Sequence, residues 1–419
     1  MRLLYTVLLY LLSPLLLARL WWRGRLAPAY RQRWGERLGF YWRPRLSESV
    51  WIHAVSVGEA LAAAPMIREL LARYPQTRLV ITTTTPTGSE QVRKLFADRV
   101  EHVYCPWDLP DVLARFFRVF NPRLLLVMET ELWPNMLAAA HSRGVPSVLV
   151  NGRLSEKSWR SYGRVRALAT PMLSRLTLVL AQTEVEGERF IDLGVRPQAM
   201  LATGSIKFDI DIDNALREKA AALREQFAGR PVWLAASTHP GEDQPVLAAH
   251  RQLLGGRPDA LLVLVPRHPE RFAEVANRVR DEHMTLARRS LDEAVTEQTQ
   301  VYLADTMGEL MMLFGACDLA FVAGSLVPVG GHNLLEPAAW GKPVLSGPQL
   351  HNFERIAGLL DDAGALILVR DSDQLASAVN ALLADEQRRC MSGDAARGVV
   401  AQHRGALARV LDQVAALWP

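Results

Sequence analysis

The chain has 419 residues, of which 49% are hydrophobic and 22% charged, and its formal net charge is +4. A chain of this length is too long for one ordinary core, which predicts two domains. The wide spacing of Cys105, Cys317 and Cys390 excludes a disulfide framework and a cysteine metal cluster, and it indicates a reducing compartment. The segment from Arg19 to Arg45 alone carries +7, which leaves −3 for the rest and argues against a nucleic-acid partner, because such binding needs a basic folded body.

An uncharged run of sixteen residues from Leu3 to Ala18 opens the chain, and Trp21, Trp22 and the arginine-rich segment follow it. Interfacial aromatic residues followed by arginines are typical of a membrane anchor with its N-terminus outside and the body in the cytoplasm. The run is short of a full span and contains Pro14, so a re-entrant or interfacial helix is the alternative. A cleaved signal peptide is disfavoured, because arginines stand between the apolar run and the weak cleavage site at Ala27–Ala29.

From Val50 onward, short apolar runs alternate with helix-like segments, which predicts an α/β fold with two doubly wound parallel sheets. The predicted strands are 50–55, 79–83, 101–104, 124–128, 147–150, 178–181 and 200–202 in the first sheet, and 232–236, 260–265, 284–287, 300–303, 319–323, 344–345 and 365–369 in the second. The predicted parts are an anchor (1–22), a Rossmann-like domain (23–205), a linker (206–230), a second Rossmann-like domain (231–399) and a C-terminal helix (400–419) that packs back across the domains. Ligands of such sheets bind beyond the carboxyl ends of the strands, so the residues there are the candidates for function.

Two carboxylates are predicted at the carboxyl edge of the first sheet. Glu59 follows the first strand through Ser56 and Gly58, at a predicted helix start, where an ionised carboxylate can act as a general base. The alternative for Glu59 is an ordinary acidic residue that stabilises the helix start. Glu129 directly follows the strand 124–128 and is expected at the same edge.

Further polar residues follow the strands of this sheet. Thr84 either caps the next helix or meets a ligand, and Arg153 directs a cation toward the same edge. Lys207 comes after Thr-Gly-Ser at the predicted crossing between the domains, where it can reach a phosphate.

Three aspartates, Asp209, Asp211 and Asp213, alternate with isoleucine just after Lys207. Acids at this spacing point to one side of an extended chain and are compatible with a divalent-cation site of the DxD type. A solvated face next to a linker is favoured instead, because no histidine or second acidic cluster accompanies them.

The sequence GGHN at 330–333 lies between a predicted strand and a predicted helix that starts at Asn333. Gly330 and Gly331 allow the backbone to approach a ligand closely and to direct unpaired N–H groups at it, and a helix start favours a phosphate. Glu336 is expected one turn into the helix, where it can accept hydrogen bonds from ribose hydroxyls. The alternative is a glycine-rich turn before a capped helix, but His332 and Asn333 in the same turn favour a nucleotide site.

Two other segments of the second domain follow its strands. Arg267 and His268 can bind a phosphate or a base edge, with a plain surface turn as the alternative. The turn Gly308-Glu309-Leu310 opens a predicted helix, and its backbone N–H groups can bind a base or a ribose oxygen.

Together these motifs resemble the 3-deoxy-D-manno-octulosonic acid (Kdo) transferases of Gram-negative bacteria. The resemblance runs from the anchor to the C-terminal helices and rests on HAVSVGE (53–59), ETELWPN (129–135), NGRLSEKS (151–158), GSIKFD (204–209), PRHPER (266–271), the 308–310 turn and GGHNLLEP (330–337). It implies a GT-B fold, with two facing Rossmann-like domains that bind the acceptor and the CMP-sugar donor, anchored in the inner membrane with the body on the cytoplasmic side. It also implies inverting transfer of Kdo from CMP-Kdo to lipid IVA, a lipid A precursor, in lipopolysaccharide core biosynthesis, with no metal or other cofactor.

The resemblance implies roles for individual residues as well. Glu59 is the base that takes the proton from the acceptor hydroxyl, and Glu129 and Lys207 support the transition state. The expected acceptor-binding residues are Ser56, Gly58, Thr84 and Arg153, and the expected donor-binding residues are Arg267, His268, Gly308, Glu309, Leu310, Ser325, Gly330, Gly331, Asn333, Leu334, Leu335 and Glu336.

Three other functions are alternatives to this one. The first is a GT-B transferase that uses a UDP-sugar on another membrane lipid. The second, from a different class, is an anchored nucleotide-binding or scaffold protein without turnover. A dehydrogenase is disfavoured, because no G-x-G-x-x-G follows the first strand of either domain.

Overall fold

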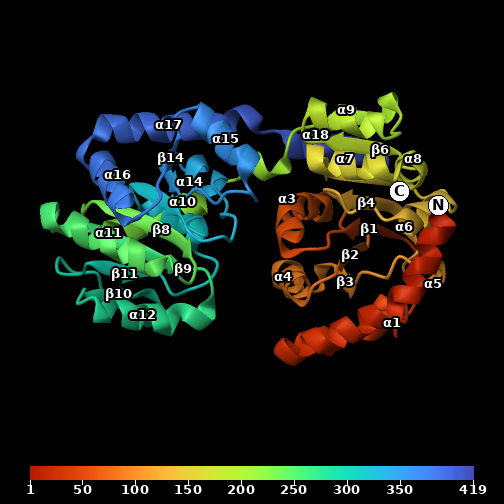
Figure 1. The fold of residues 1–419 in the computed structure, drawn as a ribbon, viewed down its shortest axis with the longest axis horizontal. Coiled ribbons are helices and arrows are strands. Elements are labelled where there is room, and N and C mark those ends of the chain that lie inside the picture. The colour runs from red at the N-terminus through yellow and green to blue at the C-terminus, as the bar shows by residue number, and fades with distance from the viewer. The chain divides into compact units, whose positions relative to one another are not determined.

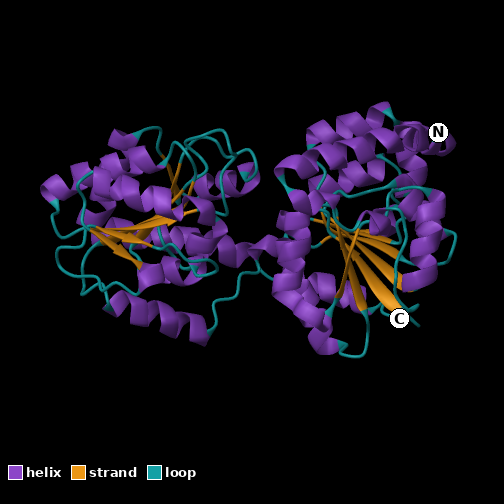
Figure 2. Cartoon of the chain, turned by 90° about the horizontal axis from the view of Figure 1, so that it is seen from below, coloured by secondary structure: helices purple, strands orange, loops and turns teal.

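The computed structural model describes residues 1–419, with the exception of the side chain of Leu26. The chain divides into two compact domains: residues 1–209 together with 404–419 form the first, and residues 210–403 form the second. Each domain has a sheet of seven parallel strands. Figures 1 and 2 show helices on both faces of each sheet. This is the α/β, two-domain fold of the GT-B type.

The first domain has the strand order β3-β2-β1-β4-β5-β6-β7. Its strands are β1 (Ser49–His53), β2 (Leu79–Thr83), β3 (Glu101–Tyr104), β4 (Pro122–Met128), β5 (Ser147–Gly152), β6 (Leu178–Ala181) and β7 (Met200–Ala202). Its α-helices are α1 (Arg2–Leu26), α2 (Trp34–Arg37), α3 (Val57–Arg73), α4 (Pro86–Phe96), α5 (Pro110–Phe120), α6 (Pro134–His141), α7 (Glu156–Arg164), α8 (Arg166–Leu173), α9 (Glu184–Asp192) and α18 (Ala406–Ala415).

The second domain has the strand order β10-β11-β9-β8-β12-β13-β14. Its strands are β8 (Val232–Thr238), β9 (Leu261–Pro266), β10 (Leu286–Arg288), β11 (Val301–Leu303), β12 (Leu319–Val322), β13 (Val344–Ser346) and β14 (Leu366–Leu368). Its α-helices are α10 (Asn214–Glu225), α11 (Asp243–Gly256), α12 (Phe272–Asp281), α13 (Leu310–Ala316), α14 (Leu335–Ala339), α15 (Glu354–Asp362), α16 (Ser372–Ala384) and α17 (Glu386–His403).

The central strands are apolar at every position because both of their faces are covered. In β4, Leu124, Leu126 and Met128 pack into one core with helices α3 and α18, whereas Leu125 and Val127 pack into the opposite core with α5, α6, α8 and α9. Successive side chains of a strand point to opposite faces, so a continuous apolar run supplies both cores. The sheet is therefore rigid at its centre, and its loops can present polar groups at the carboxyl edge.

The fourteen predicted strands are confirmed, each to within two residues at either end. The segment predicted as a linker, 206–230, contains α10, which packs into the second domain through Ala220 and Leu223, with Phe227 just beyond it. The helix predicted from Asn333 begins at Leu335 and has only five residues. Helix α17 runs from Glu386 to His403 and so extends past residue 399, where the second domain is predicted to end.

Helix α1 runs along the outside of the first domain and is drawn in red in Figure 1. By length and composition, Arg2–Arg25 could cross a membrane, with a mean hydropathy of 1.9 and only 6% of its most apolar window buried. One face nevertheless makes polar contacts with the domain: the Tyr5 hydroxyl donates to Asp108 at 3.0 Å, and the Tyr10 hydroxyl donates to Asp111. The apolar side chains of Leu11 and Leu15 are exposed on the helix.

Candidate active site

The first domain has a topological switch point between β1 and β4. The chain proceeds from β1 outward to β2 and β3, and then returns to β4 on the other side of β1. The loops after β1 and β4 therefore leave the sheet in opposite directions, and such a divergence forms the crevice in which doubly wound sheets bind ligands. Glu59 follows β1, and Glu129 and Glu131 follow β4, so the topology brings three carboxylates to this one switch point.

Glu59 lies in the first turn of α3 and takes part in a capping box with Ser56. The Ser56 hydroxyl accepts the Glu59 N–H at 3.2 Å and donates to Oε1 of Glu59 at 3.1 Å, while Oε2 accepts the Val55 N–H at 2.8 Å. This reciprocal pattern is a common way to satisfy the first N–H groups of a helix. Glu59 therefore does stabilise the helix start, and the same hydrogen bonds fix the direction of its carboxylate.

The pKa of Glu59 distinguishes it from an ordinary capping residue. Burial, together with the negative charges of Glu131 and Glu129, raises this pKa to about 7, against the lowering effect of the hydrogen bonds from Val55 and Ser56. A carboxylate with a pKa near the working pH is well suited to accept a proton in a reaction. Glu131, which the sequence analysis did not single out, is itself held with a raised pKa by burial, and the indole N–H of Trp133 donates to it at 3.2 Å.

Glu129 and Lys207 form an ion pair, with Lys207 Nζ 2.7 Å from Oε1 of Glu129. Glu129 has a φ of +53°, a left-handed conformation that is unfavourable for a residue with a side chain and that clusters at functional sites. Its N–H donates to the Val150 carbonyl at 2.9 Å, which holds this conformation at the end of β4. The structure thus unites two residues that are 78 positions apart in the sequence.

The short turn that carries Lys207 is held by Asn151 at the end of β5. Oδ1 of Asn151 accepts the Ile206 N–H at 3.2 Å, and the Asn151 backbone carbonyl accepts a hydrogen bond from Gln182 at 3.1 Å. Asn151 is fully buried and also has a positive φ, of +56°. A buried side chain in a constrained backbone position gives the neighbouring turn a fixed position, so Lys207 is supported from within the sheet.

The four expected acceptor-binding residues lie at the same edge but are not equally free. The hydroxyl of Ser56 is engaged with Glu59, and that of Thr84 donates to the Val55 carbonyl at 2.9 Å. Gly58 is exposed, and a Cβ there would meet only Oγ of Ser56, at 3.8 Å. Among the described residues, the half-buried guanidinium of Arg153 has no hydrogen bond or ion pair, which makes it the group most available to an anionic ligand.

Two of the three alternating aspartates have structural partners. Asp209 accepts the N–H groups of Gly405 and Leu407 at 2.6 and 2.7 Å, at the start of α18, and Asp213 accepts the Leu216 N–H at 2.7 Å as the cap of α10. Over residues 1–419, apart from the Leu26 side chain, no group of three or more His, Cys, Asp or Glu residues is placed to hold a metal ion. Helix capping therefore explains Asp209 and Asp213, while Asp211 is exposed.

The second domain repeats the switch-point arrangement, here between β8 and β12. From β8 the chain proceeds to β9 and beyond, and returns to β12 on the other side of β8. The GGHN turn follows β12. In the described part of the chain, the N–H groups of His332, Asn333 and Leu334 have no acceptor, whereas the Gly331 N–H donates to the Gly324 carbonyl at 2.7 Å. Three consecutive N–H groups at a switch point are well placed to bind an anion.

The two glycines of the turn have a role different from the one predicted. A Cβ at Gly330 would lie 2.5 Å from the His351 ring and 2.3 Å from the Asn352 amide, and one at Gly331 would lie 2.6 Å from the Leu350 side chain. Their φ values of +105° and +80° also favour glycine. The glycines therefore admit the protein's own 350–352 segment, and the unpaired N–H groups begin one residue later.

Glu336 and Asn333 are hydrogen-bonded to each other, with Nδ2 of Asn333 3.1 Å from Oε1 of Glu336. Burial raises the pKa of Glu336, while Asn333 and the Arg267 charge lower it. Leu334 and Leu335 have fully buried side chains, so only their backbone can contact a ligand. Because α14 has only five residues, its dipole is small. The local N–H groups therefore explain anion binding better than the helix dipole does.

Ser325 is a supporting residue in this structure. Its hydroxyl is fully buried, donates to the Val322 carbonyl at 2.9 Å and accepts the Gly347 N–H at 2.7 Å, so it joins the ends of β12 and β13. The hydroxyl hydrogen of Ser325 is therefore already used, so this side chain cannot donate a hydrogen bond to the CMP-sugar as expected.

The remaining expected donor residues lie at the same edge of the second sheet. Arg267 and His268 follow β9 and are exposed, and Nδ1 of His268 is 3.9 Å from a Glu270 oxygen. Gly308 has a φ of +89° before α13. The Glu309 carboxylate is held by Arg289 at 2.5 and 2.6 Å, which lowers its pKa, so its backbone is more available to a ligand than its side chain.

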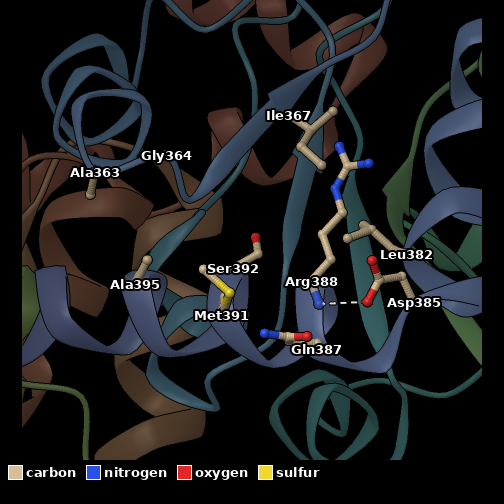
Figure 3. A pocket seen from close by; sticks show the side chains of 10 residues that line it. All are labelled: Ala363, Gly364, Ile367, Leu382, Asp385, Gln387, Arg388, Met391, Ser392 and Ala395. Atoms are coloured by element: carbon tan, nitrogen blue, oxygen red, sulfur yellow. Dashed lines mark hydrogen bonds between the residues drawn. The ribbon is translucent and has the colours of Figure 1, made fainter.

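A separate surface pocket of about 480 Å³ lies in the second domain and is shown in Figure 3. Its lining includes Gly364, which precedes β14, and Asp385, Arg388 and Met391 around the start of α17. These residues lie at the amino end of β14, opposite to the carboxyl edge, and none of them is a candidate site residue. The carboxyl edges of the sheets at the two switch points are therefore the better candidates for the chemistry.

Comparisons with known proteins indicate glycosyltransferases over most of the chain. A family model described as "3-Deoxy-D-manno-octulosonic-acid transferase (kdotransferase)" matches residues 32–210, and one described as "Glycosyl transferases group 1" matches residues 246–399. The 3-deoxy-D-manno-octulosonic acid transferase of Haemophilus influenzae is 44% identical, covering 98% of this chain and 97% of its own length. The corresponding protein of Bordetella pertussis is 37% identical, covering 97% of each chain.

The fold is also found in solved structures of distant sequence. UDP-GlcNAc 2-epimerase from Neisseria meningitidis, bound to UDP-GlcNAc, gives a TM-score of 0.58 at 16% identity and covers 88% of this chain and 99% of its own. A similarity at this identity concerns the fold alone, because one fold supports many activities.

Proposed function

The chain belongs to the family of 3-deoxy-D-manno-octulosonic acid transferases and is a glycosyltransferase, and on that premise we propose that it transfers Kdo, with inversion, from CMP-Kdo to lipid IVA in lipopolysaccharide synthesis. The observation that carries this proposal is the carboxylate of Glu59 at the switch point of the first domain, oriented by Ser56 and Val55 and with a pKa of about 7. Inverting transfer by direct displacement needs one such base beside the acceptor hydroxyl.

The acceptor is proposed to bind at the carboxyl edge of the first sheet. Glu59 takes the proton of the attacking hydroxyl as the oxygen forms its bond to the anomeric carbon of Kdo. Arg153 supplies a cation for the phosphate groups of a lipid A precursor. Lys207 places a positive charge near the reacting groups. This charge is balanced by Glu129, because Nζ of Lys207 lies 2.7 Å from the Glu129 carboxylate.

The donor is proposed to bind at the carboxyl edge of the second sheet. The free N–H groups of His332, Asn333 and Leu334 are suited to the phosphate of CMP, and Arg267 adds a positive charge at the same edge. Backbone groups of the 308–310 turn are available to the base, and Glu336 to ribose hydroxyls. Positive potential at the phosphate stabilises the charge that develops as the sugar–phosphate bond breaks.

Helix α1 is proposed to lie in the cytoplasmic face of the inner membrane and not to span it. Tyr5 and Tyr10 on one face contact Asp108 and Asp111 of the folded domain, and they cannot keep those contacts if that part of the helix crosses the bilayer. Exposed Leu11 and Leu15 provide an apolar surface for the lipid. An acceptor that carries acyl chains resides in the same membrane, so this position brings the enzyme to its substrate.

The proposal is tested by a two-substrate assay with the purified full-length protein, CMP-Kdo and lipid IVA. We expect release of CMP and a lipid product heavier by one or more Kdo residues, detected by mass spectrometry. Absence of both with a folded protein would contradict the proposal. Preference for UDP over CMP in calorimetry would favour a UDP-sugar donor, and tight CMP binding without product on any acceptor would favour a nucleotide-binding protein without turnover.

A further inference from the structure

The switch point of the second domain holds a pair of histidines that the assigned reaction does not use. His239 follows β8 and His332 follows β12, and their Nε2 atoms are 2.8 Å apart. The two rings are nearly parallel, with an interplanar angle of 10°. His268, after β9, meets His239 edge-on with ring centroids 5.2 Å apart. Imidazoles from three strand ends therefore meet at one place.

The pair is held rigidly by a buried carboxylate, Glu242. This carboxylate is fully buried and accepts four backbone N–H groups: His239 at 3.0 Å, Gly324 at 2.7 Å, and Ser325 and Leu326 both at 3.0 Å. It thereby ties the loop after β8 to the loop after β12. Gly324 leaves room for the His332 ring, since a Cβ there would lie 2.8 Å from Cδ2 of His332.

The hydrogen bond between the two imidazoles requires one proton between the two Nε2 atoms, because one nitrogen must donate and the other accept. Burial, together with Arg267 and His268, lowers the pKa of His332 to about 4, and burial lowers that of His239 as well. The charged or titratable groups that face the pair are Arg267 and His268 from the loop after β9, Arg271 just beyond it, and Glu242 from the start of α11. In the free protein the pair is therefore neutral at pH 7.

We propose that His239 and His332 form a proton-linked phosphate subsite, in which the phosphate of a bound nucleotide contacts the pair and the pair takes up one proton. His332 itself supplies the first of the three N–H groups at 332–334 that have no acceptor, so its ring belongs to the residue at which the anion site begins. The anion's charge offsets the cost of burying a positive imidazolium beside Arg267. In this singly protonated state, one proton stays between the Nε2 atoms and both Nδ1–H groups can donate.

This inference rests on the proposed function, because it takes the second domain as the nucleotide site. It adds a consequence for the reaction. When the sugar–phosphate bond breaks, both electrons of that bond leave with the phosphate oxygen, and the phosphate gains one negative charge. An imidazolium pair in contact with the phosphate stabilises this charge more in the transition state than in the bound donor.

The test is the pH dependence of CMP binding to the full-length protein, measured by calorimetry between pH 6 and 8 for the unmodified protein, His332→Gln and His239→Gln. The ionisation of CMP itself contributes equally to all three proteins, so the difference in slope isolates the histidine pair. One linked proton changes affinity by at most about tenfold per pH unit. We therefore expect CMP affinity to fall more steeply with rising pH in the unmodified protein than in either variant, with a difference of up to about tenfold per pH unit. His283→Asn, which replaces an exposed histidine of the same domain, is the matched control and should keep the unmodified slope.

A second measurement needs no variant. At pH 8, where CMP is fully ionised, calorimetry in buffers of different ionisation enthalpy should show proton uptake by the unmodified protein with CMP and none with cytidine. CMP binding with equal slopes in all variants and no proton uptake would overturn the subsite while leaving the nucleotide site intact. Failure of CMP to bind at all would instead contradict the proposed function.

Discussion

The ammonium group of Lys207 lies 2.7 Å from the carboxylate of Glu129, and the sheet enforces this contact from two directions. Glu129 is held in a left-handed conformation at the end of β4, and Asn151 holds the turn that carries Lys207 from the end of β5. The half-buried pair therefore occupies a defined position beside Glu59, whose pKa the Glu129 charge helps to raise.

Disrupting this pair should impair catalysis more than stability. We expect Lys207→Met and Glu129→Gln each to lower kcat by about tenfold or more, because each leaves the other charge without its partner and misplaces the positive potential. Residues that act as one unit are strongly non-additive, so the double variant should lose little beyond the worse single variant. The measurement is kcat for the four proteins of the cycle, with thermal unfolding as the check on folding. Strictly additive losses would show that the two residues act independently.

Activity should depend on pH through Glu59. Because the base must be deprotonated, kcat/KM for the acceptor, measured with CMP-Kdo at saturation, should rise as the pH increases and level off above an apparent pKa of about 7. Glu131→Gln removes a negative charge that raises this pKa, so its pH profile should be displaced to lower pH. An unchanged profile in Glu131→Gln would show that Glu131 does not act on the base.

The same raised pKa has a consequence for stability. The pKa of Glu59 is about 7 in the folded protein against 4.5 for the ordinary group, so the folded state binds this proton more tightly than the unfolded chain. The contribution of Glu59 to stability is therefore present at low pH and is lost as the pH rises through this interval. We expect the difference in stability between Glu59→Gln and the unmodified protein to favour the variant more at pH 8 than at pH 5, as measured by urea unfolding. The opposite order would contradict burial of the carboxyl group.

Substitutions of the aspartates that follow Lys207 can distinguish a structural role of these residues from a metal site. Asp209→Ala removes the cap of α18 and should destabilise the first domain by about 0.5–2 kcal/mol. Asp211→Ala, at an exposed position, should leave both stability and activity unchanged. Unfolding curves and transfer rates with and without added divalent cations provide the measurement. Equal loss of activity in both variants, restored by a divalent cation, would instead support a DxD metal site.

The position of α1 can be read from the depth of its exposed face in a membrane. Spin labels at Leu4, Leu11 and Leu15 in anionic vesicles should report similar, shallow depths if the helix lies in the interface. A label at Trp42, which is 97% exposed on the folded domain, should stay in water. A steady increase in depth along the three helix positions would show that the helix spans the bilayer.

Much of this architecture could be predicted from the sequence, because parallel strands buried on both faces are continuous apolar runs bounded by turn residues. The strand ends in turn identified Glu59, Glu129, Arg267 and the GGHN turn as candidates. What the sequence could not supply is the partner of each group. The sequence does not indicate Glu131, although this residue is two positions from Glu129. Its charge raises the pKa of Glu59 because Glu131 is buried, and that burial depends on the whole fold.

The second domain shows the same limit. His239 and His332 are 93 residues apart and meet only because β8 and β12 are adjacent in the sheet. The sequence predicts that Gly330 and Gly331 make room for a ligand, whereas in the structure the 350–352 segment packs against both glycines, a contact that no local pattern indicates. Ser325 was expected to bind the donor, and its hydroxyl is buried between two strand ends.

The central claim is that Glu59 is the base of a Kdo transfer, and the first domain contains a matched control for it. Thr183 and Glu186 form a second capping box, at the start of α9, with the Glu186 N–H 3.1 Å from the threonine hydroxyl. The decisive measurement is the rate of Kdo transfer from CMP-Kdo to lipid IVA by Glu59→Gln and Glu186→Gln, followed by mass spectrometry of the lipid. We expect a loss of about 10²–10⁴-fold in the folded Glu59→Gln protein and near-normal transfer in Glu186→Gln. Normal transfer by Glu59→Gln would contradict the account.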